Sequence, residues 1–184
     1  MALLETPGKE ENFKAPDFTL KNIDGNMVSL ADVRGEKGTA IFFICNHCPY
    51  VIAIIERLVP TAKRLQEIGI GVAAIMANDT ENYPADSFEN MQKFAAQHHF
   101  TFPYLIDETQ EIARAYDAVC TPDLYGFDAD DVLQYRGRLD SAGPKEADAS
   151  TAAELFNAME SVANGQVPQG QQFPSMGCSI KWRI

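Results

Sequence analysis

Two cysteines, Cys45 and Cys48, stand where a strand-like segment gives way to a helix-like one. Residues 39–44 form a continuous apolar run, which predicts a strand buried on both faces. Apolar residues then recur at helical spacing over residues 48–65, and we expect Pro60 to kink or split this helix. The chain must therefore fold so that a buried strand delivers a Cys-x-x-Cys pair to the start of a helix.

The rest of the chain continues the alternation of strands and helices. Its periodicities predict a hairpin near the N-terminus, strands at 70–77, 100–106, 124–127 and 132–136, and helices at 86–98, 108–115 and 151–163. We expect Asp86 and Glu89 to form the capping box of the helix 86–98. This order predicts an α/β fold with a central mixed β-sheet flanked by helices.

Turn-forming residues predict that the chain divides into three parts. An N-terminal arm of residues 1–12 precedes a single domain of residues 13–165. Asn164-Gly165 ends the last predicted helix, and residues 166–184 should form a C-terminal tail packed on the domain.

The net charge and the lengths of the apolar segments limit which partners the protein can bind. The chain has 15 basic and 26 acidic residues among 184, a net charge of −11, which argues against nucleic acid and anionic membranes. Its longest apolar runs are far shorter than the roughly 20 residues of a membrane helix. We expect a cytoplasmic protein, a monomer or weak dimer, in a compartment where a close cysteine pair is catalytic or metal-binding.

The spacing of the pair suits redox chemistry. Helical residues three apart share a face, so the two thiols can bridge with little backbone movement. The N–H groups and dipole of the helix should stabilise a thiolate at Cys45, which is the species that attacks disulfides. A protonated His47 would add positive charge, and Pro49 suits the first helical turn.

A Cys-x-x-Cys pair is also compatible with two other interpretations. A zinc site needs two more ligands, and the chain has no second Cys-x-x-Cys and no His-x-x-x-His. His98 and His99 are adjacent, so they would point in different directions on a helix. An accidental pair of buried cysteines is the other reading. We therefore predict no metal and no cofactor.

The strand, Cys-Asn-His-Cys and helix together resemble the thioredoxin superfamily. Residues 15–20, Asp24-Gly25 and residues 28–30 are similar to the opening of its redoxin branch, which holds the alkyl hydroperoxide reductase and thiol-specific antioxidant proteins. Thr121-Pro122 resembles the cis-proline loop that faces the cysteine pair in that fold. The resemblance implies a thioredoxin-like fold from about residue 13 to residue 163.

The resemblance also implies roles. Cys45 matches the exposed attacking thiol and Cys48 the buried resolving thiol of a thiol–disulfide oxidoreductase, with Asn46, His47, Thr121, Pro122 and Cys120 supporting the site. Its substrates would be disulfide-containing proteins or small thiols, with an unidentified electron donor. Because a histidine precedes the second cysteine, we expect a redox potential less reducing than that of thioredoxin.

Departures from the family pattern keep alternatives open. Residues 39–44 include no acid, so the proton acceptor is unassigned. The peroxiredoxin signature is Pro-x-x-x-Thr/Ser-x-x-Cys. If Cys48 is aligned with the peroxide-reactive cysteine of this signature, Cys45 stands at the Thr/Ser position and Ile41 at the proline position. The incomplete signature predicts that peroxide is a poor substrate. The alternatives are a peroxiredoxin-like thiol peroxidase acting as an antioxidant, and a redoxin-fold protein that handles copper.

Two further cysteines lie outside the pair. Cys120 precedes Pro122 by two residues, and we expect a buried packing residue rather than a third redox partner. Cys178 could be a resolving thiol or part of the tail's docking segment. We favour docking, because Ile180 and Trp182 offer apolar anchors at strand spacing.

Overall fold

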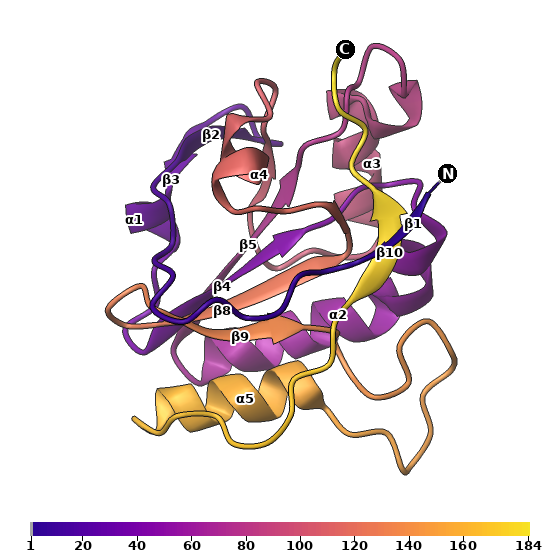
Figure 1. Ribbon diagram of the computed structural model, residues 1–184. Coiled ribbons are helices and arrows are strands. Elements are labelled where there is room, and N and C mark those ends of the chain that lie inside the picture. The colour runs from indigo at the N-terminus through magenta and orange to yellow at the C-terminus, as the bar shows by residue number, and fades with distance from the viewer. Residues whose placement is uncertain (1) are drawn as a thin grey trace.

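The computed structural model describes residues 2–184, so Met1, the first residue of the expected arm, lies outside the described residues. Strands and helices alternate along the chain (Figure 1). The elements are β1 (Leu3–Glu5), β2 (Thr19–Asn22), β3 (Met27–Ser29), α1 (Leu30–Val33), β4 (Gly38–Phe43), α2 (Pro49–Glu67), β5 (Ile70–Met76), the 3₁₀-helix η1 (Pro84–Asp86), α3 (Phe88–Gln97), β6 (Tyr104–Ile106), α4 (Glu111–Ala115), β7 (Cys120–Thr121), β8 (Asp123–Asp128), β9 (Leu133–Gly137), α5 (Glu154–Ala163) and β10 (Met176–Ser179).

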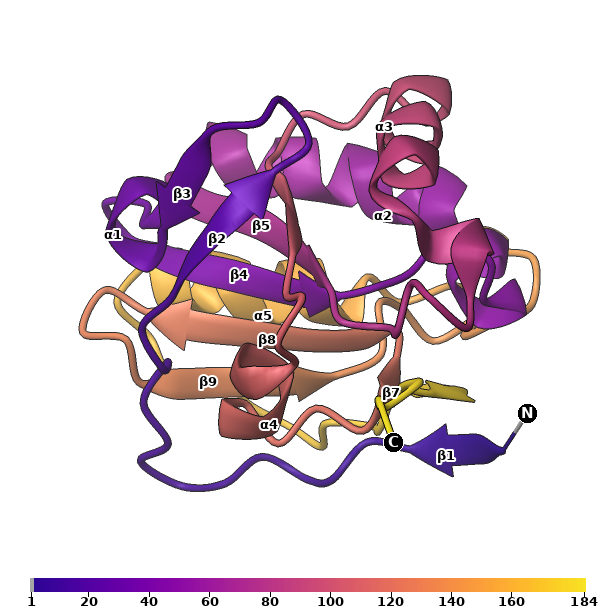
Figure 2. The ribbon, with the colours of Figure 1, turned by 90° about the horizontal axis from the view of Figure 1, so that it is seen from above.

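The main sheet is mixed, which confirms the predicted architecture. Its seven strands lie in the order β3-β2-β6-β5-β4-β8-β9 (Figure 2). Strands β4, β5 and β6 run parallel, whereas β2, β8 and β9 join antiparallel. All six residues of β4 are buried, as expected for a central strand covered on both faces.

Alternate residues of β4 face two different cores. Phe42 packs with residues of α2, α3 and α5 on one face of the sheet. Phe43 packs on the other face with α1, α4 and the buried rings of Tyr116 and Tyr125. Burial of each large side chain contributes about 1.5–3 kcal/mol to the free energy of unfolding. The two cores therefore fix the end of β4, where the cysteine pair begins.

Helix α2 differs from the expectation at Pro60. The helix is continuous from Pro49 to Glu67 with Pro60 inside it, so of the two expected effects, a kink or a split, the split does not occur. Pro60 lies on the exposed side of the helix, where water can bond the carbonyl that the missing N–H leaves free. The buried stripe, which includes Val51, Leu58 and Leu65, stays in one line and holds the helix on the sheet.

The chain ends meet in a second, smaller sheet. Strand β10 pairs antiparallel with β1 on one side and with β7 on the other. In Figure 2 the yellow β10 lies beside β1 and β7 at the edge of the molecule. Within residues 2–184, no helix has both the length and the apolar character needed to cross a bilayer.

Candidate active site

The cysteine pair lies between β4 and α2, as predicted. Strand β4 ends at Phe43, and Cys48 is the N-cap residue of α2, directly before Pro49. Cys45 is only 2% exposed and Cys48 is fully buried. The expected exposure of Cys45 is therefore wrong, because Thr121, at the end of β7 and next to Pro122, lies against its thiol.

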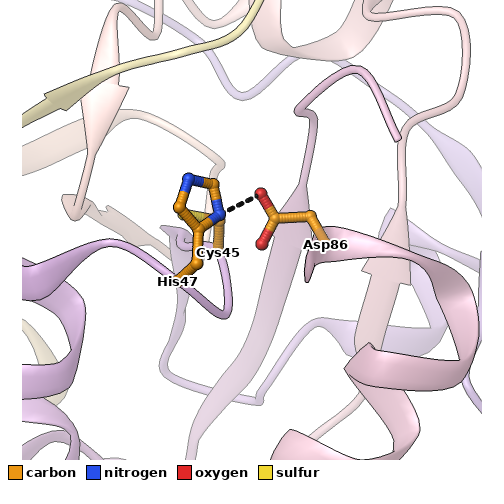
Figure 3. A group of neighbouring side chains, drawn as sticks. All are labelled: Cys45, His47 and Asp86. Carbon is orange, nitrogen blue, oxygen red and sulfur yellow. Dashed lines mark ion pairs between the residues drawn. The ribbon is translucent and has the colours of Figure 1, made fainter. Parts of the chain in front are cut away.

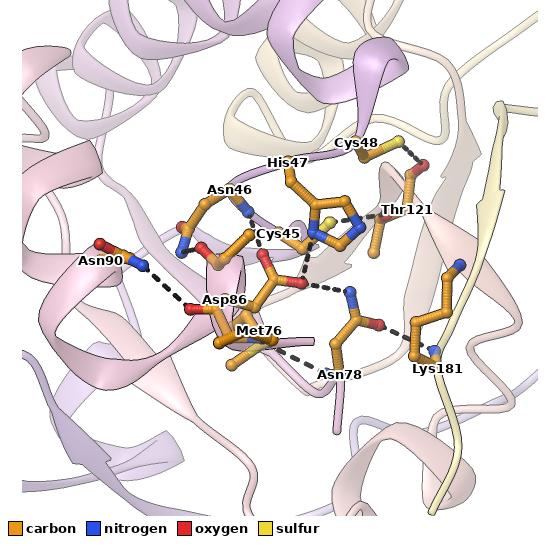
Figure 4. Close-up of polar contacts among 12 residues, drawn as sticks. Cys45, Asn46, His47, Cys48, Met76, Asn78, Asp86, Asn90, Thr121 and Lys181 are labelled. Carbon is orange, nitrogen blue, oxygen red and sulfur yellow. Dashed lines mark hydrogen bonds and ion pairs between the residues drawn. The ribbon is translucent and has the colours of Figure 1, made fainter. Parts of the chain in front are cut away.

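That loop contains the predicted cis-proline. The Thr121-Pro122 peptide bond is cis, which confirms the expectation drawn from the resemblance. The Thr121 hydroxyl lies 3.4 Å from the Cys45 sulfur, and the Thr121 carbonyl accepts a 3.1 Å hydrogen bond from the Cys48 thiol. Thr121 thus contacts both sulfurs of the pair, as Figure 4 shows.

The pKa values of the two cysteines are shifted in opposite directions. The pKa of Cys48 is lowered, chiefly because the Cys45 thiol donates to its sulfur, with further donation from Cys178 and from the backbone of Val51. The pKa of Cys45 is raised because Cys45 keeps that proton, because it is buried, and because Asp86 is near. The expectation of a thiolate at Cys45 is therefore wrong. Helix α2 begins three residues later than that expectation needs, so its free N–H groups face Cys48.

A fully buried carboxyl group, Asp86, lies beside Cys45. The backbone N–H of Asn46 donates to one of its oxygens at 2.8 Å, and the Asn78 side-chain amide donates to the other at 2.7 Å. The Nδ1 atom of His47 lies 2.7 Å from the same oxygen as Asn78, close enough for an ion pair, although it is not aligned as a hydrogen bond. Figure 3 shows His47 directed at this carboxyl group above Cys45.

The dipeptide between the cysteines holds this arrangement in place. The Asn46 side chain accepts a 2.9 Å hydrogen bond from the Tyr104 hydroxyl and donates to the Ala85 carbonyl at 3.2 Å. The His47 ring stacks on the Tyr83 ring, with 6.2 Å between centroids. Asn46 and His47 therefore anchor the segment around η1 that carries the buried acid, which gives both predicted supporting residues a structural basis.

Sequence reasoning missed three of these residues, Asp86, Asn78 and Tyr104. The capping-box prediction for Asp86 is wrong, because Ser87 is the N-cap residue of α3 and accepts a bond from the Asn90 backbone. Asp86 instead points into the site as the last residue of η1. The one sequence signal was the adjacent Ser87, which can cap the helix equally well and leaves the acid free.

The two remaining cysteines also lie near the pair. Cys120 is fully buried, and burial raises its pKa to about 12, as suits a packing residue. Cys178 is 5% exposed and pairs with Thr121 across β10 and β7. It belongs to the same buried cluster as Cys45 and Cys48, and it lies close enough to Cys48 to lower the pKa of that cysteine. The tail thus docks as a strand, and its cysteine reaches the pair as well.

One group of side chains has the composition of a metal site. Among residues 2–184, Cys45, His47 and Asp86 form the one set of three such ligands whose donor atoms lie within 4.8 Å of one another. One sulfur, one nitrogen and one oxygen donor suit a borderline cation such as Zn²⁺. However, Asp86 already accepts two hydrogen bonds, which a metal would have to displace in part.

A buried strand, a Cys-x-x-Cys pair at a helix N-terminus and a facing cis-proline loop define a thioredoxin-fold redox centre. Residues 12–136 match the model of the AhpC/TSA family. The chain belongs to this family, which confirms the resemblance to the redoxin branch.

Similar proteins extend over most of the chain. A crystal structure of an uncharacterized conserved protein from Geobacillus kaustophilus is 44% identical, has a TM-score of 0.94, and is matched over 100% of this chain and 97% of that one. Thioredoxin-like protein YneN of Bacillus subtilis is 30% identical over 69% of this chain and 71% of its own length. Thiol-disulfide oxidoreductase ResA of Bacillus thuringiensis is 28% identical over 67% of this chain and 64% of its own length.

Proposed function

We propose that the protein is a thiol–disulfide oxidoreductase that cycles Cys45 and Cys48 between dithiol and disulfide. The observation that carries the proposal is the contact of both cysteines with Thr121 beside the cis-proline: the Thr121 hydroxyl lies 3.4 Å from the Cys45 sulfur, and the Thr121 carbonyl accepts a hydrogen bond from the Cys48 thiol. Membership of the redoxin family and the similarity to ResA support the same chemistry.

The cycle balances as two exchanges. The Cys45 thiolate attacks one sulfur of a substrate disulfide, forms a mixed disulfide, and releases the other sulfur as a thiolate. The Cys48 thiolate then attacks the Cys45 sulfur and releases the second substrate thiolate, which leaves a Cys45–Cys48 disulfide. An external dithiol donor returns the pair to the reduced form by the reverse steps.

The first exchange requires Cys45 to lose its proton. His47 and Asp86 are the proton acceptors we assign, because their donor atoms lie within 4.8 Å of the Cys45 sulfur. They take the place of the acid that the strand before the pair lacks. Asp86 is held by Asn46 and Asn78, so it is oriented before substrate arrives.

The substrate-binding site that we assign is a cavity beside the cis-proline. A cavity of about 100 Å³ is lined by Tyr50 and Ile54 of α2, by Pro122, and by Ser175 and Met176 at the start of the tail strand. Its lining is mainly apolar, which suits the chain around a protein disulfide. We assign disulfide-containing proteins or small disulfides as substrates, and a cytoplasmic location and a monomeric or weakly dimeric state stay predictions.

The test is reduction of insulin disulfides with dithiothreitol as donor. We expect the wild type to accelerate the reaction, and Cys45→Ser and Cys48→Ser each to abolish the acceleration. Cys120→Ser is the matched control, because it removes a buried thiol outside the pair and should keep the activity. Full activity in Cys45→Ser would contradict the proposal.

A thiol peroxidase is a second candidate, favoured by the position of Cys48. This cysteine caps α2 and has a lowered pKa, as a peroxide-reactive thiol needs. Peroxide consumption that is lost in Cys48→Ser but kept in Cys45→Ser would favour it. We expect little consumption, because Cys48 is fully buried and Cys45 stands where the signature needs a hydroxyl.

Metal handling, copper included, is the third candidate and rests on Cys45, His47 and Asp86. Stoichiometric metal that is retained through purification and lost in both Cys45→Ser and His47→Ala would favour it. Metal that is lost in neither variant would exclude this site.

A further inference from the structure

The tail strand approaches the cysteine pair more closely than simple docking needs. A Cβ atom on Gly177 would lie 1.8 Å from the Thr121 carbonyl oxygen, so only glycine permits this approach. The same carbonyl accepts the hydrogen bond from the Cys48 thiol. The residue after this glycine is Cys178, whose register partner is Thr121.

This approach brings a third thiol into direct contact with the pair. Cys178 packs in the same buried cluster as Cys45 and Cys48, and it lies opposite Thr121, whose carbonyl accepts the hydrogen bond from the Cys48 thiol. It lies close enough to Cys48 to lower the pKa of that cysteine. Cys48 therefore has two neighbouring cysteines, Cys45 and Cys178, in one buried cluster. A sulfur with two thiol neighbours can form a disulfide with either.

The tail is also bonded to the polar part of the site. The Lys181 backbone N–H donates to the Asn78 side-chain oxygen at 2.9 Å, and the Asn78 amide donates to Asp86 at 2.7 Å. Figure 4 shows this chain from the tail to the buried acid. The segment that carries Cys178 is therefore held at two points of the site, one at Cys48 and one at Asp86.

We infer that Cys178 is a third redox thiol, which accepts the disulfide from the pair. The inference rests on the proposed function. The Cys178 thiolate attacks the Cys48 sulfur of the Cys45–Cys48 disulfide, forms a Cys48–Cys178 bond and expels Cys45 as a thiolate. The exchange conserves electrons and needs no further oxidant, and the proton of Cys178 passes to Cys45.

The exchange would change what the oxidised protein presents to its partners. With the disulfide between Cys48 and Cys178, helix α2 is covalently joined to strand β10, and Cys45 is again a free thiol under the cis-proline loop. An electron donor that reduces the Cys48–Cys178 disulfide must reach it beneath the tail. This position is beside the cavity that Met176 and Pro122 line. The substrate would therefore meet the Cys45 thiol, whereas the donor would meet the Cys48–Cys178 disulfide.

Disulfide mapping tests the inference. The Cys45→Ala variant is treated with oxidised glutathione, the remaining thiols are alkylated, and tryptic peptides are compared with and without reductant. Trypsin leaves Cys48 and Cys178 on different peptides, because Arg57, Lys145 and Lys181 are cleavage sites between and beside them. We expect a Cys48–Cys178 link in most molecules, and alkylation of Cys178 should fall by about tenfold.

Matched variants define the outcome. Cys45→Ala with Cys120→Ser should keep the link, and Cys45→Ala with Cys178→Ser should lose it.

In the wild type, oxidation should give the Cys45–Cys48 and Cys48–Cys178 forms together. Glutathione left on Cys48 with Cys178 free would overturn the inference. A wild type that forms only Cys45–Cys48 and still reduces insulin would overturn the inference but keep the proposed function. Failure to form any disulfide would overturn both.

Discussion

Two buried carboxyl groups, Asp86 and Asp123, flank the end of β4 and are held in different ways. Both are fully buried. Asp123 forms a 2.8 Å ion pair with Arg136, which is itself 5% exposed, and accepts a 3.0 Å hydrogen bond from the Tyr125 hydroxyl. Asp86 is held by neutral amide groups and by His47, and within residues 2–184 no arginine or lysine pairs with it.

Each carboxyl group faces a different cysteine. The pKa of Cys120 is raised first by burial and then by the charge of Asp123. The pKa of Cys45 is raised by its bond to Cys48, by burial, and then by the charge of Asp86. This difference indicates that Arg136 balances the charge of Asp123 within an ion pair, so Asp123 stabilises the fold. Asp86 lies beside Cys45 and His47, where the proposed function assigns it as a proton acceptor.

The largest expected effect is on stability at Asp123. Asp123→Ala would leave the Arg136 charge buried without a partner, which should lower the free energy of unfolding by about 3–5 kcal/mol. Asp86→Asn should cost only about 1–3 kcal/mol, the range for a buried group whose hydrogen bonds are disturbed. Guanidinium unfolding curves of the two variants measure the difference, and equal losses would remove the distinction between the two acids.

The next effect is on turnover at Asp86. Asp86→Asn should lower the rate of insulin reduction at neutral pH by about 100-fold, because a proton acceptor is lost. The deficit should narrow as the pH rises and hydroxide removes the proton instead. Asp123→Asn is the control and should keep its rate per folded molecule. A deficit that is the same at every pH would show a purely structural role for Asp86.

A smaller but more specific effect is expected on the pKa of Cys48. Cys45→Ala removes the thiol that donates to Cys48, so the pKa of Cys48 should rise towards the ordinary value of a free cysteine. In the wild type, the thiolate persists as the pH falls below that ordinary value and is lost only at the lowered pKa. Titration of thiolate absorbance measures both proteins. Asp123→Asn should leave the Cys48 titration unchanged, and identical curves for Cys45→Ala and wild type would contradict the assignment.

The redox potential gives the smallest expected shift. A stabilised thiolate favours the reduced form, so the potential of the pair should lie above thioredoxin's value of about −270 mV. Equilibration with glutathione buffers measures it. A value at or below that of thioredoxin would show that Cys45 and the other neighbours of Cys48 do not favour the reduced form by stabilising the Cys48 thiolate.

Local patterns predicted the centre of the site, and the parts that come from distant segments were missed. The pair, the helix after it and the Thr121-Pro122 loop could be read from short motifs in the sequence. Asp86 lies about 40 residues from Asn46 along the chain, and its contact depends on how η1 packs after β5. No local periodicity encodes such a contact. The helical pattern did suggest a role for Asp86, but it was the wrong one.

The position of Cys178 shows the same limit in another form. The period-two pattern of the tail predicted a docking segment, and β10 is a strand. Its register against β7 sets Cys178 opposite Thr121 and depends on Gly177, which fits a space that the tail sequence alone does not reveal. Likewise, the motif predicted that the Thr121-Pro122 loop faces the pair, but it did not predict how closely Thr121 packs on the Cys45 thiol, which depends on tertiary packing.

The central claim is that Cys45 and Cys48 form one dithiol–disulfide couple. The most direct measurement is mass spectrometry after one equivalent of oxidised glutathione is added to the reduced wild type and to Cys48→Ser. The account predicts that the wild type forms an internal disulfide and releases both glutathione molecules. In contrast, Cys48→Ser should keep one glutathione on Cys45. An internal disulfide at Cys45 in Cys48→Ser, or a lasting glutathione adduct on the wild type, would contradict the claim.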